Sequence, residues 1–437
     1  MRTDGASSRT LRVGFILGRF PSLTETFVMR ELHWIRGYDV EVYIFPLLSP
    51  KAAPVHKQAI ELLPRVRYSP FISVDVARAQ IRMIRRSPRR YLIAIAKLIC
   101  QTYREPGVLL RALAIFPKSV YFACQMEYMG INHVHAQFVW LQGLAAGVVS
   151  DLLGITFSIR PHAFDLFMRN QRNVRAQLEN ATKIITISEY HRHYISALCP
   201  QIGFESIDVV HCGVDADRYR HESVRRVIQP LVILSVGSLI EKKGHEYLLE
   251  ACSLLSERGL DFRCDIVGVG PLKKKFEAHI SRLDLRSKVS LLGALDESQV
   301  LEAYHRSQIF VLACVRTRRG DQDGIPVALM EAMACELPVI TTAVAGIPSL
   351  VHQGRTGWLV EERDALGLAN ALDVLIRDDS LRQQLGERGR RMILERFQIQ
   401  HTAARLAEIF RQVSGPLFPN QLPIREIDPL AKSGDTE

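Results

Sequence analysis

The sequence predicts an α/β fold made of two Rossmann-like domains. Short apolar runs alternate with helix-length segments, such as residues 244–255 and 298–305, and this alternation runs through the chain twice. Strand–helix alternation favours parallel sheets covered by helices on both faces, with ligands bound outside the carboxyl ends of the strands. We therefore expect two facing sheets with a site in the cleft between them. Their strands are expected at residues 13–17, 40–45, 133–136, 157–160, 184–187, 209–211, 232–236, 264–267, 289–292, 309–313, 339–342 and 358–360.

A charged stretch that ends at Pro230 marks the boundary between the two halves. We expect an N-terminal domain over residues 11–222 and a C-terminal domain over residues 223–395. Residues 396–415 are expected to form a helix that packs back toward the N-terminal domain. The proline-rich residues 416–437 are expected to be a disordered tail.

The composition and net charge indicate which partners and which compartment to expect for this protein. The 437 residues carry a formal net charge of +10, which favours an anionic partner such as a nucleotide, a lipid phosphate, a membrane surface or a nucleic acid. No recognisable nucleic-acid-binding module is present, so a nucleic-acid partner is not expected. The eight cysteines show no CxxC spacing, and four of them lie in or beside apolar runs, which indicates buried thiols in a reducing compartment: Cys252, Cys264, Cys314 and Cys335. Without a signal peptide or about 18 uninterrupted apolar residues, the chain is expected in the cytoplasm.

Residues 74–128 interrupt the alternation with a long helical segment. Between residues 78 and 97 it mixes many arginines with isoleucine, leucine and tyrosine, and Pro88 is expected to split it into two helices. One interpretation is an amphipathic helix that lies on an anionic membrane surface; the other is a solvated basic helix packed on the domain.

Two glycine-containing turns in the second half suit a phosphate ligand. After the strand that ends at Val236, a helix is expected to begin near Gly244, and Lys243 stands at its positive end, where a diphosphate would bind. Gly268 and Gly270 follow the next strand and allow a ligand to approach the backbone closely. The third glycine of a dinucleotide fingerprint is missing, so an ordinary strand-to-helix turn explains this pair equally well.

The stretch from Asp323 to Glu331 is more specific. Pro326 suits the first turn of a helix expected at residues 327–334, whose free amides can hold a phosphate or sugar hydroxyls. Glu331 lies one turn further on, where a carboxylate could accept two hydrogen bonds from the vicinal diol of a ribose. The alternative is a capped helix with a surface glutamate. Asp321 and Asp323 also spell D-x-D, but two carboxylates are too few ligands to predict a metal site.

These segments resemble, in order along the chain, the family 4 retaining glycosyltransferases, which have the GT-B fold. The stretch 324–334 with Leu337-Pro338-Val339-Ile340 is similar to the E-x₇-E region of that family, and Glu241–Gly244, Gly268–Pro271, residues 292–295 and residues 356–360 also match. In the first half, residues 20–28, 134–136, 160–165 and 211–215 resemble a branch that builds bacterial exopolysaccharides, including colanic-acid-type transferases.

The resemblance implies a nucleotide-sugar donor site in the C-terminal domain and an acceptor site in the N-terminal one. Lys243 would balance the diphosphate charge, Glu331 would hold the ribose, and Asp323 would lie near the donor sugar. His162 would contact the sugar beside the reacting carbon; His191 and His193, by contrast, are expected on a surface helix. The remaining donor-site positions would be Gly18, Ser238, Gly268, Gly270 and the backbone of Gly324, Ile325, Pro326 and Val327.

Three positions depart from the family pattern. Ser238 stands where an arginine is common, Asp323 is one methylene shorter than the usual glutamate, and Glu336 stands where a glycine is common. A substitute phosphate cation could be Arg19, Arg160, Arg316, Arg318 or Arg319.

The resemblance implies a retaining transfer from a nucleotide-diphosphate sugar to a glycan or a polyprenyl-diphosphate-linked glycan, without metal or cofactor. Such an enzyme would work in the cytoplasm or on the inner face of the cell membrane. The alternatives are a catalytically silent nucleotide- or glycan-binding homologue and a GT-B sugar-nucleotide epimerase.

Overall fold

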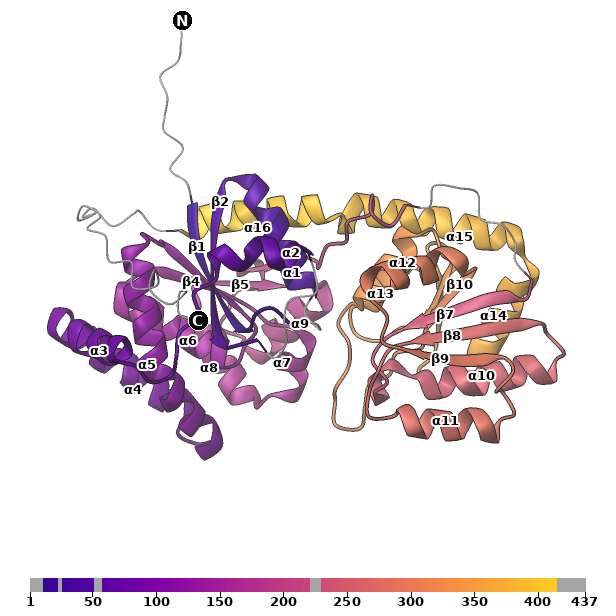
Figure 1. Ribbon diagram of the computed structural model, residues 1–437, viewed down its shortest axis with the longest axis horizontal. Helices are drawn as coiled ribbons and strands as arrows, with labels where there is room; N and C mark the ends of the chain where they lie inside the picture. The colour runs from indigo at the N-terminus through magenta and orange to yellow at the C-terminus, as the bar shows by residue number, and fades with distance from the viewer. Residues whose placement is uncertain (1–10, 23–25, 51–56, 221–228, 415–437) are drawn as a thin grey trace, which may run out of the picture.

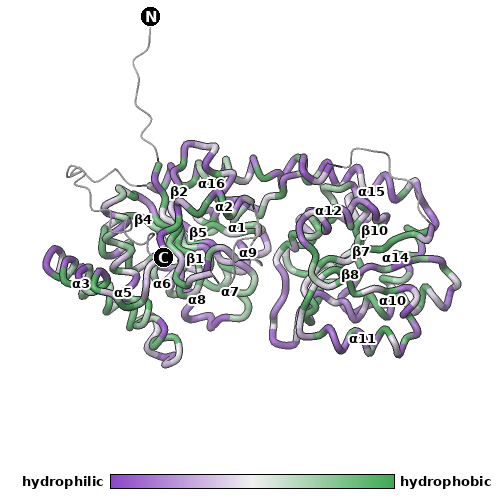
Figure 2. The backbone as a smooth tube through the Cα atoms, viewed as in Figure 1, coloured by the Kyte–Doolittle hydropathy of each residue, from purple (hydrophilic) through white to green (hydrophobic). Residues whose placement is uncertain are grey.

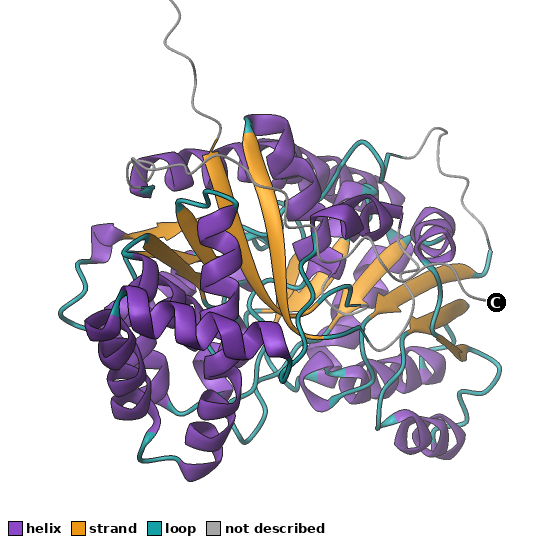
Figure 3. Cartoon of the chain, turned by 60° about the vertical axis from the view of Figure 1, so that its left-hand side comes forward, coloured by secondary structure: helices purple, strands orange, loops and turns teal. Residues whose placement is uncertain are grey.

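The computed structural model describes residues 11–22, 26–50, 57–220 and 229–414. The tail expected at residues 416–437 lies outside the described residues, as does most of the charged stretch before Pro230. The described residues form two six-stranded parallel sheets with helices on both faces, which confirms the predicted fold class (Figures 1 and 3).

The first sheet has the strand order β2-β1-β3-β4-β5-β6 and the second has the order β12-β11-β10-β7-β8-β9. All twelve predicted strands are present, although β6 begins two residues before the predicted one, because its apolar residue Ile207 is the buried one. The strands are β1 Leu11–Arg19, β2 Val40–Leu48, β3 His133–Gln137, β4 Thr156–Arg160, β5 Lys183–Thr186, β6 Ile207–Val209, β7 Leu231–Val236, β8 Phe262–Val267, β9 Val289–Gly293, β10 Ile309–Leu312, β11 Val339–Thr342 and β12 Trp358–Val360.

Helices connect most of the successive strands of both sheets. Around the first sheet lie α1 Thr26–Ile35, α2 Lys57–Leu62, α3 Val74–Arg86, α4 Pro88–Thr102, α5 Pro106–Tyr128, α6 Leu141–Leu153, α7 Ala163–Met168, α8 Gln171–Asn180 and α9 Glu189–Leu198. Around the second lie α10 His245–Glu257, α11 Lys273–Arg282, α12 Glu297–Arg306, α13 Val327–Ala334, α14 Ala365–Arg377 and α15 Asp379–Met392, and the chain ends in α16 Ile399–Val413.

The segment 74–128 forms three helices, so the expectation of two was wrong. Pro88 begins α4 as expected, but Pro106 makes a second break and begins α5, at a position where its missing N–H costs nothing. By length and composition α5 could cross a membrane, although half of its most apolar stretch is buried inside the molecule, where it packs against α3 and α6. Lys118 of α5 is itself buried and donates to the carbonyl oxygens of Leu47 and Ser69.

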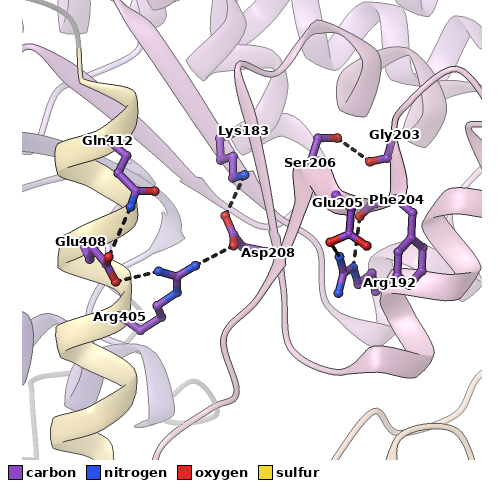
Figure 4. A network of polar contacts seen from close by, with 10 residues as sticks. All are labelled: Lys183, Arg192, Gly203, Phe204, Glu205, Ser206, Asp208, Arg405, Glu408 and Gln412. Atoms are coloured by element: carbon purple, nitrogen blue, oxygen red, sulfur yellow. Dashed lines mark hydrogen bonds and ion pairs between the residues drawn. The ribbon is translucent and has the colours of Figure 1, made fainter.

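The last helix returns from the second domain to the first (Figure 1). α16 packs against α1, and its Phe410 ring lies 5.8 Å from the ring of Phe15 on β1. Figure 4 shows the polar contacts that accompany this packing: Arg405 of α16 donates to Asp208, which also pairs with Lys183 at 2.7 Å. The first described strand, β1, and the last described helix, α16, therefore pack together in the first domain.

The four cysteines expected in the core are all fully buried. Their thiols lie within apolar clusters of the second domain. The prediction that they are small buried hydrophobic residues is confirmed.

Glu336 holds the left-handed backbone conformation that a glycine would adopt more easily. Its φ is +59°, and the N–H of Leu337 reaches back to the carbonyl of Ala332, so α13 ends in a normal left-handed cap. A side chain in this conformation costs about 1–2 kcal/mol. The glutamate therefore strains the helix end without altering its course.

Glu336→Gly is expected to unfold at a higher denaturant concentration than Glu336→Ala. Both substitutions remove the carboxylate that lies 3.5 Å from Arg390, but only glycine removes the Cβ that disfavours a positive φ. After the greater flexibility of glycine in the unfolded chain is subtracted, we expect a difference of about 0.5–1 kcal/mol in the free energy of unfolding. Urea titration of the two variants measures this difference in the free energy of unfolding. Equal midpoints would contradict the backbone strain at residue 336.

Candidate active site

The proposed phosphate-binding lysine lies beside the proposed sugar-binding aspartate. Lys243 ends a short 3₁₀ turn after β7, and its Nζ is 2.6 Å from Asp323 Oδ2; Lys242 is 3.5 Å from the other oxygen and 3.0 Å from Asp321. Burial would lower the pKa of Lys243, but its acidic neighbours, Asp323 foremost, together outweigh burial and raise it. Burial would likewise raise the pKa of Asp323, and the two lysines lower it instead. Both side chains are therefore charged at neutral pH.

The glycine turns beside this pair have no room for side chains. A Cβ on Gly268, where φ is +147°, would come within 2.0 Å of the carbonyl oxygen of Gly237, and one on Gly270 within 2.4 Å of that of Leu239. Close backbone packing thus explains both glycines without a ligand. Ser238 is exposed beside them at the carboxyl end of β7.

The loop before α13 touches the first domain. The helix spans Val327–Ala334 as predicted, with Pro326 immediately before it, so the unpaired N–H groups of its first turn follow Gly324 and Ile325. A Cβ on Gly324 would lie 2.9 Å from the ring of His191 of α9. His191 was expected on the surface; instead it is fully buried at this contact, and burial lowers its pKa to about 4.

Glu331 is buried in a polar cluster that spans both domains. Its Oε1 accepts hydrogen bonds from Arg30 of α1 at 2.8 Å and from the Tyr219 hydroxyl at 2.7 Å, and its Oε2 accepts from Tyr304 at 3.1 Å. Arg30 also lies 3.3 Å from Glu297 of α12. The alternative of a surface glutamate is wrong, because the cluster covers the carboxylate. Its role in holding a ribose stays a prediction.

The residue after Arg30 makes a second buried ion pair, within the first domain. Glu31 accepts a hydrogen bond from Arg160 at the end of β4, and Arg160 also donates to the carbonyl oxygens of Val210 and His211. Arg160 is fully buried and both of its terminal nitrogens are engaged in these contacts, so in this structure it is not free to bind a phosphate. Arg316, Arg318 and Arg319 are exposed in the loop after β10.

His162 follows β4 and lies between two aromatic rings. Its ring centroid is 5.1 Å from that of Phe27 and 4.7 Å from that of Phe138, and its Nε2 is 3.2 Å from Gln137 Nε2. Phe138 has a φ of +100°, a strained conformation that directs its ring onto His162. Burial, followed by the charge of Arg160, lowers the pKa of His162 well below its usual value, so the ring is neutral.

Gly18 lies at the end of β1, where a Cβ would be 2.7 Å from Nε2 of Gln142 of α6, so a larger residue would require that side chain to move. The structure thus places Lys243 next to Asp323, in the loop that precedes α13. Gly18 and His162 belong to the first domain, at the carboxyl ends of β1 and β4.

Sequence reasoning missed several residues of this region. Arg30 lies two residues beyond the first-half motif at residues 20–28 and had no role. Tyr219 and Tyr304 gave no signal because single tyrosines are common. Lys242 was visible beside Lys243, and its pairing with Asp321 accounts for the D-x-D pattern by charge neutralisation. Within the described ranges no cluster of three or more metal-ligating side chains occurs.

Comparison with known proteins places this arrangement in a family. Residues 220–392 match the family described as glycosyl transferases group 1. The amylovoran biosynthesis glycosyltransferase AmsK of Erwinia amylovora is 30% identical over 387 residues, which cover 83% of this chain and 90% of that one. A putative colanic acid biosynthesis glycosyltransferase, WcaL of Salmonella typhimurium, is 27% identical over 425 residues, which cover 92% of this chain and 100% of that one.

Solved structures agree on the architecture. Anabaena HepE in complex with UDP has a TM-score of 0.68 at 14% identity, covering 92% of this chain and 100% of that one. Sucrose-phosphate synthase from Thermosynechococcus elongatus has a TM-score of 0.69 at 18% identity, covering 92% and 98%. At such identities the likeness shows the fold alone, which is GT-B.

The sequence match over most of the chain, together with the two facing sheets, settles the family. The chain belongs to the group 1 glycosyltransferases and has their GT-B fold.

Proposed function

We propose that this glycosyltransferase moves a sugar, with retention of configuration, from a nucleotide-diphosphate sugar to a hydroxyl of a glycan or of a polyprenyl-diphosphate-linked glycan. The observation that carries the proposal is the contact between Lys243 and Asp323 beside the N-terminus of α13, where the two domains meet. A buried cation and free helical amides together suit a diphosphate. The names of AmsK and WcaL support a role in exopolysaccharide synthesis.

The proposed mechanism needs positioning and charge stabilisation more than a dedicated base. The departing phosphate oxygen takes the proton of the acceptor hydroxyl on the same face of the sugar, while Lys243 and the first amides of α13 stabilise the charge that develops on the diphosphate. His162, from the first domain, contacts the donor sugar. Because lysines already balance Asp321 and Asp323, we propose that transfer proceeds without a metal ion.

A panel of nucleotide sugars tests the proposed activity. Incubation of the purified protein with UDP-, GDP- and ADP-sugars and a mixture of lipid-linked glycans from a polysaccharide-producing bacterium is expected to release nucleoside diphosphate, with or without EDTA. The new linkage, examined by NMR, is expected to keep the anomeric configuration of the donor.

Other outcomes identify the alternatives. Conversion of the donor without acceptor would indicate an epimerase, and nucleotide binding without turnover across the panel would indicate a silent homologue. An inverted linkage would contradict retention.

Lys243→Ala is expected to lower kcat about 10²–10³-fold, because a preorganised cation would be lost from the leaving group. The matched control is Lys275→Ala, which removes an exposed lysine of the same domain that pairs with Glu246. Initial rates of nucleotide release measure the effect, and circular dichroism checks the fold of both variants. Near-normal turnover of the Lys243 variant would contradict the assigned site.

We also propose that α3 and α4 bind an anionic membrane surface. α3 packs on α5 through one face, which buries Val76, Ala79 and Met83, and α4 packs on both α5 and α6. Hydrophilic and hydrophobic residues alternate along α3 (Figure 2). Ile81, Ile84 and Leu92 are exposed, and a shallow depression of about 510 Å³ is lined by Ile81 with Arg78, Arg82, Arg85 and Arg86. Such a face suits anionic lipid headgroups above acyl chains.

The structure distinguishes free arginines from engaged ones. Arg82 and Arg86 pair with Glu127, and Arg90 donates to the carbonyl of Leu152, whereas Arg85 and Arg89 are exposed and have no described partner. We therefore expect Arg85→Ser/Arg89→Ser to weaken sedimentation with vesicles that contain phosphatidylglycerol. Each arginine near an anionic surface contributes about 1 kcal/mol, so the loss is expected to be about 30-fold.

Arg282→Ser/Arg286→Ser is the matched control, because both residues are exposed on the second domain. It is expected to bind as the unchanged protein does. Equal loss in both variants would indicate a response to net charge alone, and no loss in either would contradict the proposed surface.

A further inference from the structure

An arginine of the first domain lies between two aromatic rings at the edge of the sheet that carries His162. Arg169 follows α7, and its guanidinium carbon is 3.9 Å from the centre of the Trp140 ring and 5.0 Å from that of the Phe164 ring. Trp140 directly precedes α6, and Phe164 lies in the first turn of α7. The two rings therefore come from the segments that follow β3 and β4, at the carboxyl ends of these strands.

The guanidinium of Arg169 has donors without acceptors. Its Nε is buried and has no hydrogen-bond partner, and within the described part of the chain no hydrogen bond or ion pair involves its terminal nitrogens. Burial lowers the pKa of Arg169, and the Asp165 carboxylate offsets only part of that effect. Asp165 instead accepts hydrogen bonds from the backbone N–H groups of Val139 and His162. The faces of the cation are thus covered by rings, while its edge is unused.

Stacking on a ring does not by itself leave an arginine without acceptors, as Arg192 of the same domain shows. Its guanidinium carbon is 4.0 Å from the centre of the Phe204 ring, yet it donates to the carbonyl oxygen of Phe204 and to the carboxylate of Glu205 (Figure 4). Arg169 has the same ring contact without these acceptors. A guanidinium binds phosphate through two parallel hydrogen bonds along one edge, so an arginine held by its faces is suited to this ligand.

The residues on the two sides of this arginine differ in character. On one side, Phe164 is exposed and lies two residues after His162. On the other side, Arg111 of α5 adds a second positive charge, and its neighbours Leu110 and Leu113 are exposed. In Figure 1, α7 and α8 lie between α5 and the second domain. Exposed apolar residues, cations and the proposed reaction centre thus follow one another from α5 toward the second domain.

We propose that Arg169, together with Arg111, binds the diphosphate of a polyprenyl-diphosphate-linked acceptor. The acceptor sugar then lies toward Phe164 and His162, and the polyprenyl chain lies toward the exposed leucines of α5. Such an acceptor has its parts in the same order: an apolar chain, two phosphates and a sugar. The role of this ligand as acceptor rests on the proposed function, and the site selects the lipid-linked class from the two acceptor classes proposed above.

Binding of farnesyl diphosphate, a short soluble polyprenyl diphosphate, tests the site without any sugar transfer. In titration calorimetry, Arg169→Met is expected to weaken this binding about 10–100-fold, because methionine cannot donate the charge-assisted hydrogen bonds that the phosphates would accept. Farnesol, which has the chain but no phosphates, is expected to bind both proteins equally weakly. Equal affinity of the two proteins for farnesyl diphosphate would overturn the proposal.

Arg192→Met is the matched control, because it removes an arginine with the same ring contact whose donors are already engaged. It is expected to bind farnesyl diphosphate as the unchanged protein does, and an equal loss in both variants would overturn the proposal as a response to net charge. Lys243→Ala is expected to keep the binding. Loss in that variant alone would place the ligand in the donor site and would also overturn the proposal.

Trp140 supplies a readout at the site itself. Trp34→Phe/Trp358→Phe leaves it as the one tryptophan of the three in the chain. Its fluorescence is expected to change as farnesyl diphosphate binds, and unchanged emission at a saturating concentration would overturn the proposal. This readout decides if Arg169→Met does not fold.

Vesicles that contain phosphatidylglycerol distinguish the diphosphate of an acceptor from an ordinary lipid headgroup. Arg169→Met is expected to sediment with them as the unchanged protein does. Weakened sedimentation to the same degree as the weakened farnesyl diphosphate binding would assign Arg169 to the membrane surface and overturn the proposal.

The reaction separates this inference from the proposed function. Arg169→Met is expected to raise the KM for a lipid-linked acceptor at least about tenfold and to leave the KM for the nucleotide sugar unchanged. If transfer proceeds with an unchanged acceptor KM, the inference is overturned and the proposed function stands. If no donor supports transfer, the proposed function fails, while a loss of farnesyl diphosphate binding in Arg169→Met would still establish the diphosphate site.

Discussion

The junction of the two domains depends on two adjacent charges of α1 that are buried against different partners. Neighbouring residues of a helix point about 100° apart, so Glu31 reaches Arg160 within the first sheet while Arg30 reaches Glu331 in the second domain. Neither charge can lose its partner cheaply, because breaking a buried ion pair costs about 3–5 kcal/mol. A single helical turn therefore fixes the end of β4, and with it His162, relative to the helix that carries Glu331.

The first sheet shows a second way to bury polar groups, which is to keep them neutral and connected. His133 and His135 would be costly inside a parallel sheet if they were charged, yet as neutral rings they satisfy one another through Ser158. The cover that keeps them neutral comes from Phe410, near the end of the chain. The site on the first domain thus depends on a helix that follows the second domain in the sequence.

Apolar periodicity was enough to predict the strands and α13, because buried parallel strands read as continuous apolar runs. It could not predict the buried polar groups. His135 was part of a recognised motif. Both faces of a parallel sheet are covered, however, so the alternation of polar and apolar residues along a strand does not tell which side chains face a hydroxyl group on the adjacent strand. His191 was expected on a surface helix, whereas Phe167 of the same domain and Gly324 of the other domain lie against its ring. The interdomain pairing of Arg30 likewise depends on tertiary geometry that spacing does not encode.

The hydrogen bonds at Glu331 limit how a ribose could bind there. A carboxylate oxygen has two lone-pair sites, and Oε1 already accepts from Arg30 and Tyr219, while Oε2 accepts only from Tyr304. A vicinal diol held by both oxygens must therefore displace one of the two donors on Oε1. Tyr219 directly precedes the second domain in the sequence, whereas Arg30 belongs to α1 of the first domain. Displacing Arg30 would therefore release a contact between the domains. In the proposed reaction, nucleotide binding and the relative position of the two domains would thus be coupled through one carboxylate oxygen.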